Sequence, residues 1–265
     1  DFITRARREG GVMSARSIRI ASSHITPVDM DVTASPDGDD GGLGAIAQGT
    51  WGDGDAGGYT SGRERDVDLE DAYLGWRSAG GLLDLSFGRQ QFQLGDGFLI
   101  AGDRINLGKG ALLGGADVDR GGAYYLAARH AFDRTAMLRL GGEQGVHGSV
   151  LWLKSDNRAQ AETELAAGTL DYTAAAGTLG LTWVHGMNVT DQWASDFQKQ
   201  REGLDTYSLR GEGSAGIDNA SFAFEYAWQD KDAGPEKAWY AEAGYTFADV
   251  GWSPKVTYRY TRYSQ

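Results

Sequence analysis

Apolar and polar residues alternate one by one along several stretches of the chain, most clearly in residues 220–229. The apolar positions there are Phe222, Phe224, Tyr226 and Trp228, and the positions between them are small or polar. A period of two places successive side chains on opposite faces of a β-strand. The same period recurs in residues 206–210, 239–247 and 255–261. About a dozen such segments fit between residues 12 and 263, so the pattern predicts an all-β protein.

Breaks rich in Gly, Asp and Asn separate these segments, and they come in two lengths. The breaks at 174–177 and 215–219 are short enough for hairpins, whereas those at 27–42, 51–68 and 186–203 are long. Tight turns at one rim and long loops at the other are typical of an up-and-down barrel. We therefore predict an antiparallel up-and-down transmembrane β-barrel, a single domain over residues 1–265 with about 12–14 strands.

Alternation alone does not say which face is buried, because a soluble sandwich buries its apolar face and a membrane barrel turns it to lipid. Two features favour the barrel. Small residues interrupt the apolar face, which would leave a sandwich core poorly packed. Tryptophans also lie near segment ends, as interfacial girdles require: Trp76, Trp152, Trp183, Trp228, Trp239 and Trp252. The same alternation assigns Leu151 and Leu153 to the apolar face.

Composition removes several classes of protein. The chain has no cysteine, which excludes disulfide frameworks, cysteine-ligated metals and thiol catalysis. Its 37 acidic and 25 basic residues give a net charge of −12, which argues against nucleic acid as a partner. No apolar run reaches the length of about 18 residues that a transmembrane helix needs. The polar start at Asp1 and the end at Gln265 lead us to expect an internal portion of a longer protein.

Residues 82–100 carry the sharpest motif: an apolar strand runs into Gly-Arg-Gln at 88–90, followed by Gly-Asp-Gly at 95–97. This block resembles the alginate export family, as do residues 71–77, 238–247 and 252–260. The resemblance implies an outer-membrane β-barrel of Gram-negative bacteria, with roughly 18 strands when complete. It also implies a porin-like exporter of an anionic polysaccharide, with a lumen rich in arginine. The expected location is therefore the bacterial outer membrane.

The candidate residues of the substrate pathway are those assigned to the lumen: Arg89, Arg129, Arg139, Arg210, Arg259, Glu225 and Glu242. A guanidinium is permanently charged and presents paired donors to a carboxylate, which suits repeated weak capture of uronate groups. The alternative is that Glu212, Glu225 and Glu242 neutralise the arginines, which then act only as struts. Arg89 is assigned from the family motif; strict alternation points it outward unless a bulge at Gly88 turns it in.

Enzymatic signals are weak, and we predict no catalytic residues, no metal centre and no cofactor. Glu225 and Glu242 have the residue type of a glycosidase pair, but chance pairs are expected where every strand carries inner polar residues. Residues 42–47 match a dinucleotide fingerprint by letters without a βαβ unit around them. A loop calcium site stays open beside the reading as solvated turns, on the aspartates Asp37, Asp39, Asp40, Asp53 and Asp55.

The sequence therefore favours an outer-membrane channel for an anionic polysaccharide or small anionic solutes. Its expected partners are outer-membrane lipid, the anionic saccharide and other periplasmic or envelope proteins. Two alternatives remain: a structural or adhesive barrel within a larger envelope assembly, and a soluble β-protein that binds carbohydrate on aromatic faces.

Overall fold

The structure is a computed structural model that describes residues 71–78, 80–103, 130–231 and 234–264 in full. It also describes the backbone of the strands at 5–8, 11–16, 28–36, 40–52, 64–70, 112–113 and 116–117. Statements about side chains below refer to the fully described ranges.

The described part of the chain contains sixteen strands. The first eight are β1 (Arg5–Arg8), β2 (Gly11–Arg16), β3 (Val28–Pro36), β4 (Asp40–Gly52), β5 (Glu64–Arg77), β6 (Leu83–Gln91), β7 (Leu112–Leu113) and β8 (Ala116–Asp117). The others are β9 (Ala131–Leu140), β10 (Gly145–Lys154), β11 (Thr163–Ala174), β12 (Gly177–Val189), β13 (Asp205–Gly213), β14 (Ala220–Asp230), β15 (Glu236–Thr246) and β16 (Lys255–Tyr263). The described helices are short, namely η1 (Arg158–Gln160) and α1 (Asp196–Lys199), and none is long or apolar enough to cross a membrane.

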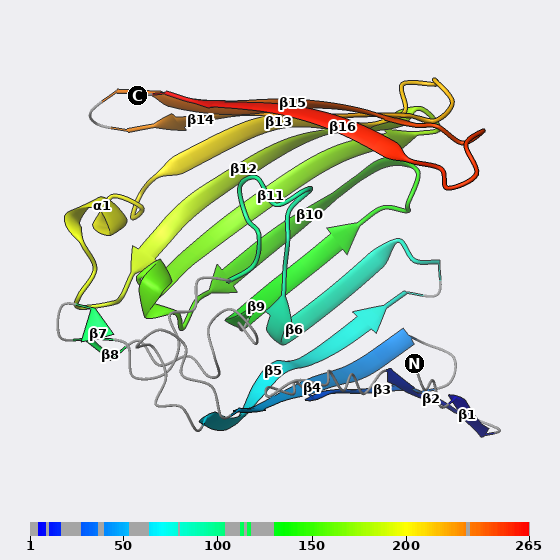
Figure 1. Cartoon of the computed structure of the whole chain (residues 1–265). Helices are drawn as coiled ribbons and strands as arrows, with labels where there is room; N and C mark the ends of the chain where they lie inside the picture. Colours follow the sequence, from blue (N-terminus) through cyan, green and yellow to red (C-terminus); the bar gives the residue numbers. More distant parts are fainter. Residues whose placement is uncertain are drawn as a thin grey trace.

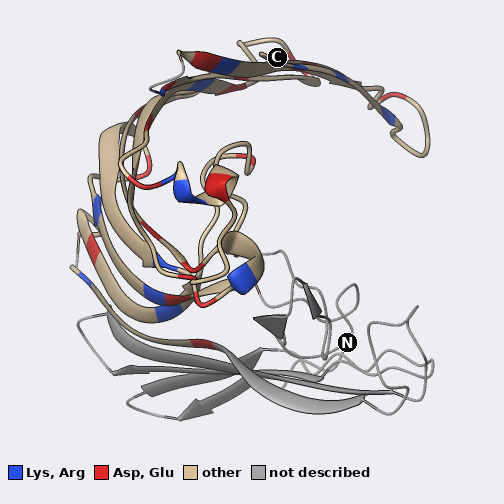
Figure 2. Ribbon diagram, turned by 90° about the vertical axis from the view of Figure 1, so that its left-hand side faces the viewer, with Lys and Arg blue, Asp and Glu red and all other residues tan. Residues whose placement is uncertain are grey.

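Fourteen of the strands form one sheet in chain order, from β1 at one edge to β16 at the other, and β7 pairs with β8 apart from it. Every pairing is antiparallel, so the topology is up-and-down, as the sequence predicted. The sheet curves strongly (Figure 1), and Figure 2 shows the described strands as an open curve with chain segments on its concave side. The fold is thus a partial barrel wall with an inner and an outer face.

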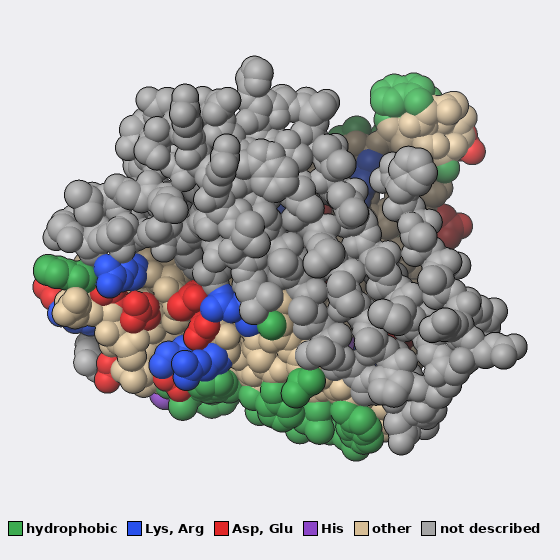
Figure 3. All heavy atoms as spheres, turned by 90° about the horizontal axis from the view of Figure 1, so that it is seen from below, with side chains coloured by type: hydrophobic (Ala, Val, Ile, Leu, Met, Phe, Trp, Pro, Cys, Tyr) green, Lys and Arg blue, Asp and Glu red, His purple; other side chains and the backbone are tan. Residues whose placement is uncertain are grey.

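The outer face of the described strands is apolar and bare. On β12 to β14, side chains such as Leu181, Leu209 and Phe224 are 37–52% exposed although they lie in the middle of the sheet. Figure 3 shows hydrophobic side chains gathered along one margin of the described part, apart from the charged ones. A soluble sandwich would bury this face, whereas a membrane barrel turns it to lipid, so the arrangement agrees with the barrel.

Aromatic side chains on the outer face lie at a common height near one rim. The strand register places Trp183 opposite Tyr207, and Tyr207 opposite Trp228. The last two rings stack with their centroids 5.5 Å apart. Such a row is typical of the girdle where a barrel wall meets the lipid headgroups.

The predicted long break at 27–42 is wrong, because strand β3 occupies most of it. The break at 51–68 is shortened at both ends, since β4 ends at Gly52 and β5 begins at Glu64, and residues 53–63 lie outside the described residues. Gly and Asp are frequent in both segments, which hides the strands because these residues have low strand propensity. The break at 186–203 does hold a long connection, which contains α1. Residues 42–47 lie on strand β4, in agreement with the rejection of the dinucleotide fingerprint.

The assignment of Leu151 and Leu153 to the outer face is also wrong. Both side chains point to the concave side and are at most 1% exposed, while Trp152 between them points outward. They belong to an apolar cluster that includes Met137 on β9 and Phe92 and Ile100 on the connection after β6. The concave side is therefore not polar throughout, because part of it is covered by residues 92–103.

Candidate functional site

The inner face carries a transverse row of mainly polar side chains. The strand register aligns, across neighbouring strands from β10 to β15, His147, Asp171, Gly180, Arg210, Glu225 and Tyr240. Alternation places all of these on the concave side, as the sequence predicted for Arg210 and Glu225.

Residues 92–103, which we call the inner loop, lie against the concave side of β10–β12 (Figure 1). The base of the loop packs on the apolar cluster through Phe92, Leu94 and Ile100, each at most 8% exposed. Within the loop, the Leu94 N–H donates to the carbonyl of Ile100 at 2.9 Å and closes it into a hairpin-like excursion. The inner loop thus narrows the space in front of the polar row.

The tip of the inner loop reaches strands β15 and β16. Arg259 Nη1 donates to Asp96 Oδ2 at 2.7 Å, and its guanidinium lies 3.6 Å from the ring centroid of Tyr240. The Phe98 ring contacts Tyr240 edge-on at 5.1 Å and stacks on Tyr263 at 6.4 Å. Residues far apart in the sequence therefore meet across the concave side, and the tip is held by one ion pair and a group of rings.

Arg89 points inward because the strand bulges at Gly88. Gly88 has φ +131°, and the register between β6 and β9 shifts between Gly88 and Gln90. A Cβ at Gly88 would lie 2.4 Å from the carbonyl oxygen of Ala72, so only glycine fits. The extra residue turns the Arg89 side chain to the polar, concave side. The sequence predicted this orientation only on the condition of a bulge at Gly88.

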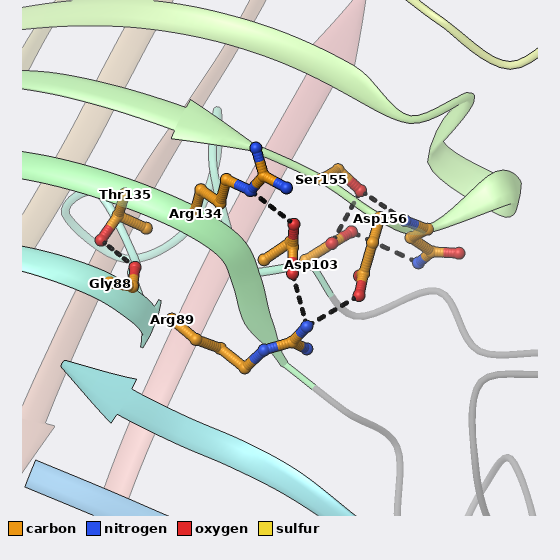
Figure 4. A network of polar contacts seen from close by, with 9 residues as sticks. Gly88, Arg89, Asp103, Arg134, Thr135, Ser155 and Asp156 are labelled. Atoms are coloured by element: carbon orange, nitrogen blue, oxygen red, sulfur yellow. Dashed lines mark hydrogen bonds and ion pairs between the residues drawn. The ribbon is translucent and has the colours of Figure 1, made fainter.

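The Arg89 guanidinium is bound by two carboxylates (Figure 4). Its Nη2 donates to Asp133 Oδ1 at 2.5 Å and to Asp156 Oδ2 at 3.1 Å. Asp133 also pairs with Arg134 Nε at 3.3 Å. This network ties β6 and β9 to the connection after β10, so Arg89 acts as a strut in this geometry.

Asp103, which the sequence analysis missed, anchors the end of the inner loop. It is 1% exposed and accepts hydrogen bonds from Ser155 Oγ at 2.7 Å and Asn157 Nδ2 at 3.3 Å (Figure 4). Its backbone N–H donates to the carbonyl of His130 at 2.9 Å. No spacing in the sequence links residue 103 to residues 155 and 157, so only the folded chain reveals this contact.

Arg210 pairs with Asp171, which is 6% exposed, and the loop tip lies on this pair. A Cβ at Gly95 would lie 3.1 Å from Arg210 Nη1, and a Cβ at Gly180 would lie 3.0 Å from its Nε. Glu225, directly opposite on β14, is 2% exposed, and its Oε1 has no hydrogen-bond partner within the described residues.

The glutamates predicted to neutralise the arginines take a minor part. Glu242 lies 3.8 Å from Arg259, which is longer than the contact of Arg259 with Asp96. The main partners are aspartates: Asp133 and Asp171 lie on strands β9 and β11, and Asp96 and Asp156 lie on connections. Pairing of the lumen arginines is thus real, but through residues that the sequence did not indicate.

Arg139 differs from the other arginines, because no carboxylate lies within ion-pair distance of it in the part of the chain that the structure describes. It lines a cavity of about 690 Å³ on the concave side, together with Arg77, His147 and Arg210. Arg77 and Arg210 each bind an aspartate there, at Asp84 and Asp171, whereas Arg139 makes no ion pair within the described residues. The cavity has the size of a site for a small solute, and its acidic residues, Asp84, Glu143 and Asp171, equal its arginines in number.

Arg129 lies outside the described residues, as do the side chains of the five aspartates considered for calcium. Among the fully described residues, no group of three or more His, Asp or Glu side chains is placed to hold a metal ion.

No protein-family model matches the chain, and no curated protein matches it. Solved structures do. An anion-selective porin from Comamonas acidovorans aligns over 91% of this chain and 70% of its own length, with a TM-score of 0.51 and 11% identity. Pseudomonas aeruginosa OccK8 (OprE) aligns over 99% of this chain and 72% of its own, with a TM-score of 0.45 and 12% identity. A BenF-like porin from Pseudomonas fluorescens Pf-5 aligns over 98% of this chain and 71% of its own, with a TM-score of 0.47 and 11% identity.

The likeness to the Comamonas acidovorans structure shows the fold. The chain has the all-β, antiparallel, up-and-down fold of an outer-membrane porin barrel.

Proposed function

We propose that this chain is the wall of an outer-membrane channel that passes anionic solutes by diffusion, without a cofactor and without a covalent step. The observation that carries the proposal is the cavity on the concave side, where Arg139 is exposed and has no ion-pair partner among the described residues. The porin fold and the apolar outer face support the location in the outer membrane. The solved porin from Comamonas acidovorans is anion-selective, which adds support for the sign of the solute.

The polar row and the cavity suit weak and repeated capture of a carboxylate. Guanidinium groups present paired donors to a carboxylate, and conduction requires each site to bind weakly enough for the solute to leave. Arg77 and Arg210 already hold aspartates, so an incoming anion competes for their remaining donors. Arg139 offers all its donors, and we assign it the main role in attracting the anion.

An anionic oligosaccharide or polysaccharide of the alginate type is the finer form of the proposal. It rests on the resemblance of residues 82–100 to the alginate export family and on the arginines of the inner face. No family model matches the chain, so we infer the transported solute from chemistry. A uronate polymer carries one carboxylate per sugar, and Arg77, Arg139 and Arg210 line the same cavity.

A structural or adhesive barrel in a larger envelope assembly is the second candidate. The observation that favours it is that Arg89, Arg210 and Arg259 are all bound to aspartates, and that Arg259 holds the tip of the inner loop through Asp96. In that case the arginines are struts, and the inner loop closes the barrel.

Single-channel current in planar bilayers separates the two candidates. The complete protein is refolded in detergent and measured with and without oligouronate. The proposal expects an anion-selective conductance that the oligomer blocks, and Arg139→Gln lowers the anion preference by removing the unpaired cation. Arg262→Gln is the matched control, because Arg262 lies opposite the outward Trp239 and makes no ion pair within the described residues. A folded, heat-modifiable barrel without conductance would refute the channel and favour the structural role.

A further inference from the structure

A second cavity, of about 450 Å³, lies between the inner loop and strands β11–β13, near the rim of the longer connections. Its walls combine apolar side chains, such as Leu99, Leu165 and Val184, with polar ones, such as Asp103, Thr206 and Gln229. The volume falls in the usual range for small-molecule sites, and apolar walls with a few polar groups are typical of such sites. The cavity is separate from the one lined by Arg139 and shares no lining residue with it.

One cation lines this cavity, Arg201, on the connection between β12 and β13. The backbone around it is fixed: the Gly186 N–H donates to the carbonyl of Leu204 at 3.0 Å, and the Gly203 N–H donates to the carbonyl of Gly186 at 2.7 Å. Gly186 has no space for a side chain, since a Cβ there would overlap the carbonyl oxygen of Arg201. The guanidinium is therefore held at the cavity by the packing of its own loop.

The partners of Arg201 are neutral oxygens. Its Nη1 donates to the carbonyl of Gln160 at 3.0 Å and lies 3.5 Å from Thr163 Oγ1. No carboxylate lies within ion-pair distance of it in the described ranges. Burial lowers the pKa of the Arg201 guanidinium from its ordinary value, and the cause is lost hydration. Asp103 lines the same cavity, but its carboxylate is bound by Ser155 and Asn157, so an anion placed beside Arg201 gains a charge-assisted contact.

We propose that this cavity binds a small organic monoanion that has an apolar body and one carboxylate. The carboxylate lies on Arg201, and the body packs on the leucine and valine walls. This cavity has more apolar side chains in its wall than the cavity lined by Arg139, with Leu165, Val184 and Leu204 among them. The site is therefore distinct in chemistry from the proposed saccharide pathway, and it goes beyond that function because it binds whether or not the chain conducts.

Calorimetric titration of the refolded complete protein in detergent tests the site with cyclohexanecarboxylate. Cyclohexylmethanol, which has the same ring without the charge, and acetate, which has the charge without the ring, are the comparison probes. We expect binding of cyclohexanecarboxylate, with the alcohol and acetate each at least about tenfold weaker. Titration into empty micelles corrects for partition of the ring into detergent.

Two variants make the test specific. Arg201→Gln is expected to weaken cyclohexanecarboxylate about 10- to 100-fold and to leave the alcohol unchanged, while Arg262→Gln, on the outer side, leaves both unchanged. Val184→Phe fills the cavity from its wall and is expected to abolish binding of both ring compounds. Heat modifiability confirms that each variant is folded.

Three results would overturn the proposal: no binding to the wild-type protein, equal binding of the acid and the alcohol, or full binding after either cavity variant. Bilayer recordings keep the two proposals apart. Binding to a barrel that does not conduct supports this site and refutes the channel, whereas conductance without binding refutes this site alone.

Discussion

The contact between Arg259 and the tip of the inner loop is the most direct perturbation that the structure offers. Arg259 makes an ion pair with Asp96 at 2.7 Å and lies over the ring of Tyr240, and its side chain is 37% exposed. Ion pairs at this exposure contribute about 0.2–1 kcal/mol, and a cation over an exposed ring contributes about 0.5–1 kcal/mol. Together these contacts stabilise the docked tip by about 0.7–2 kcal/mol, which is about a 3- to 30-fold preference.

Arg259→Gln is therefore expected to raise the ratio of undocked to docked tip by about 3- to 30-fold. Asp96→Asn removes only the ion pair and is expected to raise it by about 1.4- to 5-fold. The double variant should behave like Arg259→Gln alone, because both changes remove the same contact. The observable is the share of time that single-channel current spends at the higher level, since an undocked tip widens the passage.

Lys255→Gln is the matched control. Lys255 is a cation on the same strand and of the same parity as Arg259, and within the described residues it makes no ion pair. The reasoning fails if Arg259→Gln leaves the current levels as in the wild type. It also fails if the effects of the two single variants multiply in the double variant, because the residues would then act independently.

Three further changes test the strand bulge, the loop anchor and the lipid face, with unfolding in detergent as the readout. Gly88→Ala forces a Cβ to 2.4 Å from a backbone carbonyl at φ +131° and should destabilise the fold by about 1–3 kcal/mol, whereas Gly142→Ala, with open space around it, should be neutral. Asp103→Ala leaves two buried donors without their acceptor and should cost about 1–3 kcal/mol; an unchanged unfolding midpoint would contradict the anchor. Leu181→Arg places a charge on the outer face and should lower the free energy of unfolding by about 2–4 kcal/mol if that face meets lipid. Leu181→Ile should change it little, and equal effects of the two variants would indicate that the outer face meets water.

The sequence predicted the inner and outer faces well where one face of a strand is polar. On β13 the outward Tyr207 and Leu209 and the inward Arg210 follow the period of two, and β14 follows it along its whole length. The bulge at Gly88 was also predictable from the sequence. The family motif implied an inward Arg89 while strict alternation pointed it outward, and a bulge reconciles the two. These predictions depend only on the parity of neighbouring residues, which a sequence displays directly.

The carboxylate partners of the arginines could not be predicted from the sequence. Asp96 meets Arg259 across the concave side, and Asp156 meets Arg89 from a connection, so both contacts depend on how loops fold inward. Alternation gives the parity of a residue but not the strand register, so it also missed that Arg210 binds Asp171 two strands away. Arg201 lay in a break with no chemical motif, and only its packing on Gly186 brings it to a cavity.

The error on β10 points to a rule about inner loops. Residues 150–153 read Val-Leu-Trp-Leu, an apolar run on both faces, where neighbouring β13 alternates cleanly. A strand that is apolar on both faces needs cover on both, and in a membrane barrel lipid supplies only the outer one. The inner cover is the base of the inner loop, held by apolar packing and by Asp103. The tip lies over polar strands instead and is held by an ion pair and rings. The base of the loop is therefore fixed by burial, and the tip is the part that a passing solute is able to displace.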